Sequence, residues 1–327
     1  MNNLFPSSMK RSLFWLLDYH PHAESNEADT MLKAIEHCCI AERLGFTAAW
    51  CAEHHFQTLG MIPNPAVFLA ALSQKTTMLR IGPAISVLPL HNSIQIAEDY
   101  AMVDQLSGGR LNMGVGTGGQ AIEAQGMGTQ FGKRKELFEQ NLIDVIDRWT
   151  IASEGKININ SINAAPIQTP TPPIYVTSNQ AGMAYKIGLA GRSLLTLVSP
   201  SVGKLEDIGE RISAHKRGLR DGGHPKTVAE AVVVIFTHLN DSEERAREIA
   251  IPALGHTLSA MSGNPISDAT DVYHMMQRTG AGLFGSEQQA SEIVTRYAEV
   301  GVEHIAFLNR FGAMPWDEAE QSLNRLT

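Results

Sequence analysis

The sequence has no long apolar run, few cysteines and no excess of positive charge. None of its 327 residues belongs to an uninterrupted apolar stretch of the roughly 18 residues that a membrane helix needs. The apolar segment Ser12–Leu17 is followed at once by Asp18, so it is too short for a secretory signal peptide. The cysteines, Cys38, Cys39 and Cys51, are odd in number and lack metal-ligand spacing, which favours unpaired thiols in a reducing compartment. We therefore expect a cytoplasmic protein.

The formal net charge is −8, and the 26 lysine and arginine residues are scattered along the chain. Nucleic acids and anionic membranes both require a concentrated basic face, so neither is expected as a partner. A small molecule that carries a phosphate is compatible with this charge, because backbone N–H groups bind phosphate without basic side chains. Since the composition does not change along the chain, we expect residues 1–327 to form a single domain.

Short apolar runs alternate with longer helical patterns, which is typical of βα units in a parallel sheet. The strand candidates are Ser12–Leu17, Thr47–Cys51, Leu79–Leu88, Leu111–Gly116, Ile174–Thr177, Ser193–Val198, Val228–Leu239 and Glu303–Leu308. Eight such strands, each followed by a helix, favour a (β/α)8 TIM barrel over an open, doubly wound sheet.

Two segments break this regularity, one after strand four and one after strand seven. Glu154–Pro173 is polar and rich in proline, and Thr257–Gly285 is rich in Met, Gly and Ser without a clear period. We expect both to be irregular excursions that close the mouth of the barrel.

The active site of a TIM barrel lies at the C-terminal ends of its strands. Glu53, His54 and His55 follow the second strand and form the densest polar cluster at any strand end. Adjacent side chains of an extended chain point to opposite sides, so the two histidines are poorly placed to bind one ion together. One imidazole can act as a general base or as a hydrogen-bond donor to a cofactor while the carboxylate orients its neighbours. A buried histidine bonded to the backbone explains the residue type equally well.

A glycine-rich segment, Gly114–Gly119, follows the fourth strand. Its bare backbone amides suit an approaching phosphate. It is not a Rossmann fingerprint, because the third glycine is misplaced and no helix begins at once, and it lacks the lysine of a P-loop. A flexible turn is the alternative interpretation.

Asp18, His20 and His22 after the first strand are similar to the His-x-His motif of metal-dependent barrel hydrolases. Such sites need further ligands at later strand ends, and His238 and Asp241 near the end of strand seven are candidates. Strands four to six end without Lys or Asp, so we expect no metal site.

Several of these motifs, taken in order, resemble the bacterial luciferase-like flavin monooxygenases. The matching segments are Ala49–Phe56, Val87–Asn92, Ala97–Asp99, Asp104–Arg110, Pro172–Val176, Gly285–Ser286 and Phe311–Pro315. Order and spacing agree as well, so the resemblance covers nearly the whole chain and is densest over residues 10–150.

The resemblance implies an enzyme that binds FMN and uses reduced flavin and O2 on a small organic substrate. The flavin is usually reduced by a separate NAD(P)H:flavin reductase, and a homodimer is common in the family. His54 matches the catalytic histidine of the family and Glu53 its neighbour, so both are predicted to be catalytic. The positions that match cofactor-binding residues are Ala84, Ile85, Gly116, Thr117, Gly118, Ser178, Asn179 and Gln180.

Each group of cofactor positions has a specific expectation. Ala84–Ile85 matches the place where the family often has a non-proline cis peptide under the flavin ring. Thr117 and Gly118 match the loop that approaches the flavin phosphate, and Ser178–Gln180 matches a segment that contacts the ribityl chain and phosphate.

The chain also departs from the light-emitting members. Thr117 replaces an arginine and Asn179 an acidic residue, so light emission is not expected and the phosphate requires amides, hydroxyls or another basic residue. Arg110 is interpreted as a structural residue outside the site. Three alternatives stay open: a deazaflavin-dependent hydride-transfer oxidoreductase, a non-catalytic flavin-binding protein, and a metal-dependent hydrolase that uses His20 and His22.

Overall fold

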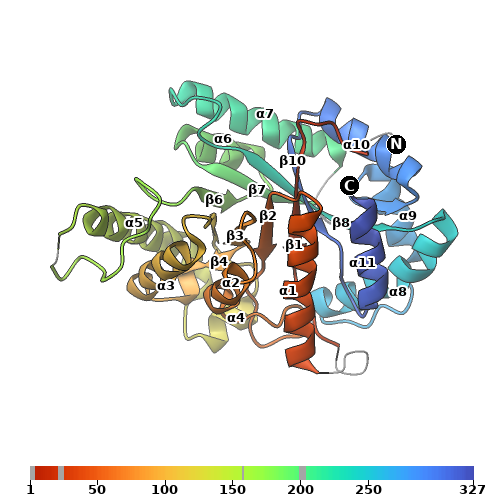
Figure 1. Cartoon of the computed structure of the whole chain (residues 1–327), viewed down its shortest axis with the longest axis horizontal. Helices are drawn as coiled ribbons and strands as arrows, with labels where there is room; N and C mark the ends of the chain where they lie inside the picture. The colour runs from red at the N-terminus through yellow and green to blue at the C-terminus, as the bar shows by residue number, and fades with distance from the viewer. Residues whose placement is uncertain (1–3, 21–25, 157, 199–203) are drawn as a thin grey trace.

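The computed structural model describes residues 4–20, 26–156, 158–198 and 204–327 and contains a parallel sheet that closes into a barrel (Figure 1). The strands are β1 Lys10–Trp15, β2 Ala48–Cys51, β3 Arg80–Pro83, β4 Ser86–Val87, β5 Met113–Gly116, β6 Ile174–Thr177, β7 Ser193–Leu197, β8 Ala231–Leu239, β9 Gly282–Gly285 and β10 His304–Leu308. Their order is β3-β2-β1-β10-β8-β7-β6-β5-β4, with β9 paired to β8. A parallel bridge between Ile81 of β3 and Leu111, which lies just before β5, closes this order into a ring. The predicted barrel is confirmed.

The third predicted strand, Leu79–Leu88, is divided into β3 and β4. The peptide between Ala84 and Ile85 separates them and is cis, as the resemblance implied. β3 pairs with β2, whereas β4 pairs with β5, so together they occupy one position in the barrel.

Helices surround the strands in Figure 1. They are α1 Glu27–Arg43, α2 Pro65–Ser73, α3 Ser93–Ser107, α4 Ala121–Gly126, α5 Arg134–Ser153, α6 Ala181–Leu189, α7 Leu205–Asp221, α8 Glu243–Ser262, α9 Thr270–Thr279, α10 Glu287–Glu299 and α11 Trp316–Arg325, with short 3-10 turns η1 Leu88–Leu90 and η2 Phe131–Lys133. Their starts follow local chemistry: the Asn64 side chain accepts from the Val67 amide and Pro65 opens α2, while Ser286 and Gln289 form a capping box at α10. None of the helices in the described part of the chain combines the length and apolar character needed to cross a membrane.

The segment after strand four is irregular as predicted, but it does not lie at the barrel mouth. The side-chain amide of Gln168 donates from Nε2 to the Leu111 carbonyl (2.7 Å) and to Asp104 Oδ1 (2.7 Å). Leu111 precedes β5, so the part of this segment around Gln168 packs at the N-terminal ends of the strands. The reason is topological: α5 runs back from the mouth, and the chain must then enter β6 from the opposite end of the barrel.

The segment after strand seven is more regular than predicted. Thr257–Gly285 contains the last part of α8, then α9 and β9. Pro252 lies inside α8, which nevertheless continues as a helix to Ser262. The Thr257 hydroxyl donates to Asp18 Oδ2 (2.9 Å), just after β1, so this segment does border the barrel mouth.

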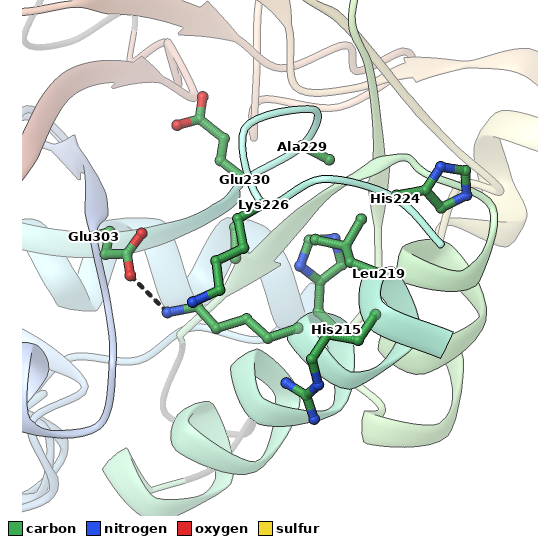
Figure 2. A pocket seen from close by; sticks show the side chains of 10 residues that line it. His215, Leu219, His224, Lys226, Ala229, Glu230 and Glu303 are labelled. Carbon is green, nitrogen blue, oxygen red and sulfur yellow. Dashed lines mark hydrogen bonds and ion pairs between the residues drawn. The ribbon is translucent and has the colours of Figure 1, made fainter. Parts of the chain in front are cut away.

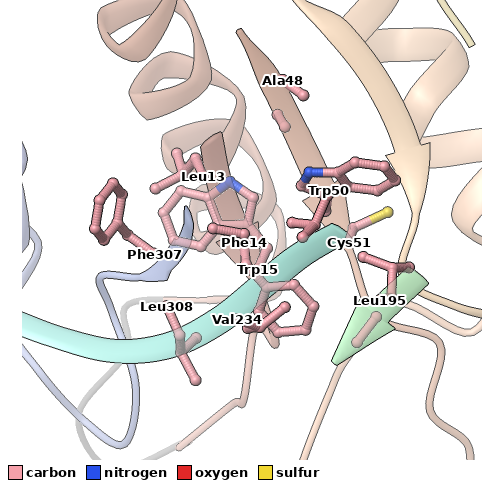
Figure 3. Packing of buried hydrophobic residues seen from close by; sticks show 14 of the residues in the cluster. Leu13, Phe14, Trp15, Ala48, Trp50, Cys51, Leu195, Val234, Phe307 and Leu308 are labelled. Atoms are coloured by element: carbon pink, nitrogen blue, oxygen red, sulfur yellow. The ribbon is translucent and has the colours of Figure 1, made fainter. Parts of the chain in front are cut away.

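The barrel interior is filled by large side chains (Figure 3). Phe14, Trp50, Leu195 and Val234 converge there from β1, β2, β7 and β8. All four are buried, and the Trp50 ring lies 4.9 Å from that of Tyr175 in an edge-on arrangement. Because the interior is packed, the barrel offers a ligand space at its ends.

Candidate active site

The predicted site residues lie at the C-terminal ends of neighbouring strands. Glu53 and His54 follow β2, Ala84–Ile85 separates β3 from β4, Gly116 ends β5, and Ser178–Gln180 follows β6. The order of the sheet places β2, β3, β4, β5 and β6 side by side around the barrel. The structure therefore brings the predicted residues to one side of the mouth.

A pocket with mostly apolar walls opens among these strand ends. Its lining residues are Phe14, Ala84, Ile85, Thr177, Leu195, Thr196, Leu197 and Val234. Two predicted cofactor residues, Ala84 and Ile85, thus form part of the wall. Apolar walls with a few polar groups at the edge suit a flat, conjugated ring system.

The glycines after β5 are required by close packing. A Cβ atom on Gly116 would lie 2.3 Å from Ile85 Cδ1. Gly118 has a φ of +70°, and a Cβ there would lie 2.6 Å from Val87 Cγ1. Both positions therefore need glycine. The loop is held against β4 rather than free to move, which disfavours the interpretation as a flexible turn.

A basic residue that the sequence left unidentified lies beside this loop. Arg134, the first residue of α5, lines a small pocket together with Thr117, Gly118 and other residues. Its guanidinium stacks 4.0 Å from the centre of the Phe131 ring and donates to the Phe131 carbonyl (3.0 Å). The sequence signal was available: Arg134 is a basic residue at the start of the long helix that follows the glycine-rich segment.

The segment after β6 leads into the N-terminus of α6. No described side chain caps this helix, and its N-cap residue is Gln180, whose amide donates to Ser178 Oγ (3.1 Å). The first amides of α6 are thus directed toward the mouth end of the barrel, where an anion is favoured. Asn179 has another role, because its Oδ1 accepts from Thr196 Oγ1 (3.0 Å) and the Leu197 amide (3.1 Å). This oxygen ties the end of β6 to β7.

Glu53 is buried at the centre of a hydrogen-bond network. Its Oε1 accepts from His55 Nε2 (3.0 Å) and His91 Nε2 (2.7 Å), and its Oε2 accepts from the Val87 amide (3.0 Å). Burial opposes ionisation, but the hydrogen bonds from the two imidazoles outweigh it and lower the pKa of Glu53. The hydrogen bond with Glu53 in turn raises the pKa of His55. The carboxylate is therefore charged and fully engaged.

His54 belongs to a different network from His55, as the alternation of side chains predicted. Its Nδ1 lies 2.9 Å from Oε1 of Glu123, a residue of α4 that the sequence analysis missed. Gly60 lies against the ring, since a Cβ there would be 2.9 Å from His54 Cδ2. The His54 side chain is 18% exposed and that of His55 is 9% exposed, so His54 is the more accessible of the two.

The residues considered for a hydrolase metal site are only partly brought together. Asp18 Oδ2 lies 3.3 Å from His20 Nε2 but also accepts from Thr257 and from the Gly312 amide (2.6 Å), while Asp241 pairs with Arg325. His22 lies outside the described residues. Among the described residues, one group has metal-ligand proximity, namely Glu53, His55 and His91. Both imidazole nitrogens lie within hydrogen-bond distance of the same Glu53 oxygen, and we interpret the group as a hydrogen-bond network.

Arg110 has the structural role that the sequence predicted. Its guanidinium donates to the carbonyls of Ser73, Thr76, Leu79 and Ser107 and to the Thr76 hydroxyl. It anchors the turns around the start of β3, away from the mouth.

A second pocket lies at the base of the barrel (Figure 2). It is lined by His215, Lys216, Leu219, Arg220, His224, Lys226, Ala229, Glu230, Ala231 and Glu303. Glu230 and Glu303 immediately precede β8 and β10, so this pocket lies at the N-terminal ends of the strands. None of the predicted site residues lines it, and we assign the candidate active site to the mouth.

Comparison with protein families identifies the class. A model of the luciferase-like monooxygenase family matches residues 9–304, and the chain belongs to this family. Two uncharacterized proteins of Sinorhizobium fredii are 30% and 32% identical over 172 and 187 residues, which are 50% and 55% of this chain and 49% and 54% of the relatives. The chain thus spans about half the length of these relatives. The oxygenase component of flavin-dependent trigonelline monooxygenase from Acinetobacter baylyi is 24% identical over 89% of this chain and 86% of its own.

Solved structures share the fold over nearly the whole chain. Monooxygenase RslO1 from Streptomyces bottropensis superposes with a TM-score of 0.85, 20% identity and 96% coverage of both chains. The oxygenating constituent of 3,6-diketocamphane monooxygenase from Pseudomonas putida, in complex with FMN, has a TM-score of 0.76, 16% identity and coverage of 97% and 96%. An F420-dependent secondary alcohol dehydrogenase has a TM-score of 0.70, 17% identity and coverage of 98% and 99%.

Proposed function

We propose that the chain is an FMN-dependent monooxygenase that uses reduced flavin and O2 on a small organic substrate. The observation that carries the proposal is that an apolar pocket lined by Ala84 and Ile85, the glycine loop after β5 and His54 lie at the C-terminal ends of neighbouring strands. Bound reduced FMN would supply the electrons for oxygen activation. The chain supplies binding, orientation and exclusion of water.

The donor groups fit the two chemically different ends of FMN. The walls around Ala84 and Ile85 suit the ring system, and the amides of Gly116–Gly118 suit the phosphate. The open N-terminus of α6 and the guanidinium of Arg134 add favourable electrostatics for an anion. Thr117 and Ser178 provide hydroxyl donors at the same edge.

His54 is the residue that we propose to act on the reacting groups. It is more exposed than His55, and its Nδ1 is held by a carboxylate, which leaves Nε2 for proton transfer or hydrogen bonding. The sequence predicted Glu53 to be catalytic together with His54. Since the Glu53 oxygens already accept hydrogen bonds from His55, His91 and the Val87 amide, we propose that Glu53 positions these groups and is not itself catalytic.

The proposed partner is a separate NAD(P)H:flavin reductase that delivers reduced FMN. The relative from Acinetobacter baylyi is the oxygenase component of its system, which supports a division of labour between two chains. We further propose that the enzyme is a cytoplasmic homodimer.

Hydride transfer with a deazaflavin is the second candidate function. A structure with coenzyme F420 shares this fold with a TM-score of 0.70, and an apolar pocket of this kind accepts either ring system. A non-catalytic flavin-binding protein is disfavoured, because it would not need a partly exposed imidazole fixed by a carboxylate.

A titration of the purified chain with three ligands tests the proposal. Oxidised and reduced FMN, coenzyme F420 and riboflavin are compared by fluorescence, with reduced FMN handled without oxygen. We expect saturable FMN binding, with riboflavin weaker because it lacks the phosphate. Preferential binding of F420 would support the hydride-transfer candidate, and failure of all ligands to bind would overturn the cofactor assignment.

A further inference from the structure

Glu123 is buried on a short helix whose surroundings are mostly exposed. It is 2% exposed, and α4 places it beside the turn that carries His54. Its Oε1 accepts from His54 Nδ1 (2.9 Å), the His55 amide (3.1 Å) and Gln57 Nε2 (2.8 Å). All three donors belong to the segment that follows Glu53, so one carboxylate oxygen organises the whole turn.

The charge of Glu123 decides the protonation of the histidine nitrogen that faces it. Burial alone would raise the pKa of Glu123, but the hydrogen bonds from His54, His55 and Gln57 outweigh it and lower the pKa. An ionised carboxylate only accepts hydrogen bonds. Gln57 Nε2 also lies near His54 Nδ1, but at 3.4 Å it is farther from that nitrogen than Glu123 Oε1 is (2.9 Å), and it donates to Glu123 at 2.8 Å. The shorter contact therefore favours a hydrogen on His54 Nδ1, and the neutral imidazole then has its lone pair on Nε2.

A second contact fixes α4 against the same turn. A Cβ atom on Gly126 would lie 2.2 Å from Phe56 Cε2, so the Phe56 ring packs directly against the helix backbone. Phe56 has a φ of +59°, which makes the turn unusual for a non-glycine residue. α4 also begins at Ala121, two residues after the last glycine of the glycine-rich loop. A single connection thus joins the proposed phosphate loop to the turn that carries His54.

We propose that Glu123 is a positioning residue that holds His54 in its Nδ1–H tautomer and so presents Nε2 as the proton acceptor of the site. The meaning of this tautomer for the reaction rests on the proposed function, whereas the tautomer itself does not.

The test uses three variants of the full chain. Glu123→Gln keeps the shape and an acceptor oxygen but removes the charge, and Glu123→Asp keeps the charge on a shorter side chain. Gln125→Ala is the matched control, because Gln125 lies on the same helix and is exposed. Circular dichroism and thermal unfolding establish that each variant folds.

Side-chain 15N NMR of the histidines reads the tautomer without any cofactor. The His54 signals are assigned by their disappearance in His54→Gln. We expect the Nδ1–H form in the unmodified chain and in Gln125→Ala, and a mixture or the Nε2–H form in Glu123→Gln. An Nε2–H form in the unmodified chain, or no change in Glu123→Gln, would overturn the proposal.

Turnover provides the second measurement. Glu123→Gln should lower kcat roughly 10- to 100-fold, as expected for losing a carboxylate that orients a functional histidine, with little change in KM. Glu123→Asp should recover part of the loss. If the chain binds no flavin, the proposed function fails while the NMR result still decides the tautomer. If flavin binds and kcat is unchanged in Glu123→Gln, the positioning role fails.

Discussion

The two ends of the barrel each contain a buried histidine–carboxylate network, and they differ in what is left accessible. At the base, His304 Nε2 lies 2.7 Å from Ser12 Oγ and its Nδ1 lies 3.2 Å from Glu230 Oε2. His304 is 2% exposed and Ser12 is fully buried. At the mouth, the His54 Nδ1 faces Glu123, and the side chain is 18% exposed.

The base network has the residue types of a serine–histidine–carboxylate triad, yet its surroundings do not permit that chemistry. Trp50 Nε1 donates to Ser12 Oγ (3.2 Å), and Glu230 also accepts from Lys10 (2.9 Å) and from the Tyr175 hydroxyl (2.6 Å). The serine is enclosed by the barrel core, so a substrate cannot reach it. At the base, Glu230 is partly exposed but the serine and the imidazole are enclosed, whereas at the mouth the imidazole itself is partly exposed. The comparison teaches that the same residue types serve folding where the imidazole is enclosed and serve chemistry where it is accessible.

The largest predicted effect is a loss of activity when His54, at the mouth, is replaced. His54→Ala should lower product formation by roughly 10²- to 10⁴-fold, the usual contribution of a general acid or base. Thermal unfolding and flavin affinity should change little, because His54 is partly exposed and lies at the end of a strand. The measurement is kcat on a substrate found by screening for oxygen consumption. Unchanged turnover would show that the role assigned to His54 is wrong.

The converse prediction concerns the base. Glu230→Ala removes the partner of Lys10, Tyr175 and His304, and should lower the free energy of unfolding by roughly 3 kcal/mol. Turnover per folded molecule should be unchanged, since the base lies at the opposite end from the site. Urea unfolding and kcat on the same preparation test both statements. If Glu230→Ala lowers kcat but leaves the free energy of unfolding unchanged, the base network serves catalysis and the proposed difference between the two ends is wrong.

The contribution of Glu230 to the free energy of unfolding should depend on pH, and its direction follows from the pKa of this carboxyl. The hydrogen bonds and charge of His304, together with Tyr175 and Lys10, overcome burial and hold the pKa of Glu230 well below its usual range. A carboxyl with a lowered folded-state pKa stabilises the fold above its unfolded pKa, and this stability is lost as the pH falls toward the folded pKa. Glu230→Gln should therefore flatten the acid side of the stability profile.

The sequence predicted the fold better than it predicted the site, for a physical reason. Strand β6 begins and ends at the predicted residues, because proline and turn residues mark such boundaries locally. Glu123 was not predicted as a site residue, because α4 has six residues, too few for a periodic pattern, and its partner His54 lies 69 positions away. Glu154–Pro173 was assigned to the wrong end because composition reveals irregularity but not the direction in which α5 returns.

Replacing Gly60 should have a smaller effect on kcat. This residue has no functional group, so the replacement changes only the position of His54 at the mouth. In Gly60→Ala, the new Cβ would lie 2.9 Å from His54 Cδ2 and 2.8 Å from the Leu16 carbonyl oxygen. The imidazole must shift, and we expect kcat to fall about tenfold with modest destabilisation. Gly132→Ala is the matched control, since no described atom lies within 4 Å of its Cβ position. Equal effects of the two substitutions would contradict the role of Gly60.

The smallest predicted effect distinguishes phosphate binding from ring binding within the mouth. Thr117→Val keeps the shape of the side chain and removes its hydroxyl. If that hydroxyl donates to the FMN phosphate, its loss should cost about 1 kcal/mol, or roughly fivefold in the dissociation constant for FMN. Riboflavin shares the ring but lacks the phosphate, so its affinity should be unchanged. A parallel loss for both ligands would mean that Thr117 supports the ring instead, and the phosphate would then depend on Arg134 and the backbone amides.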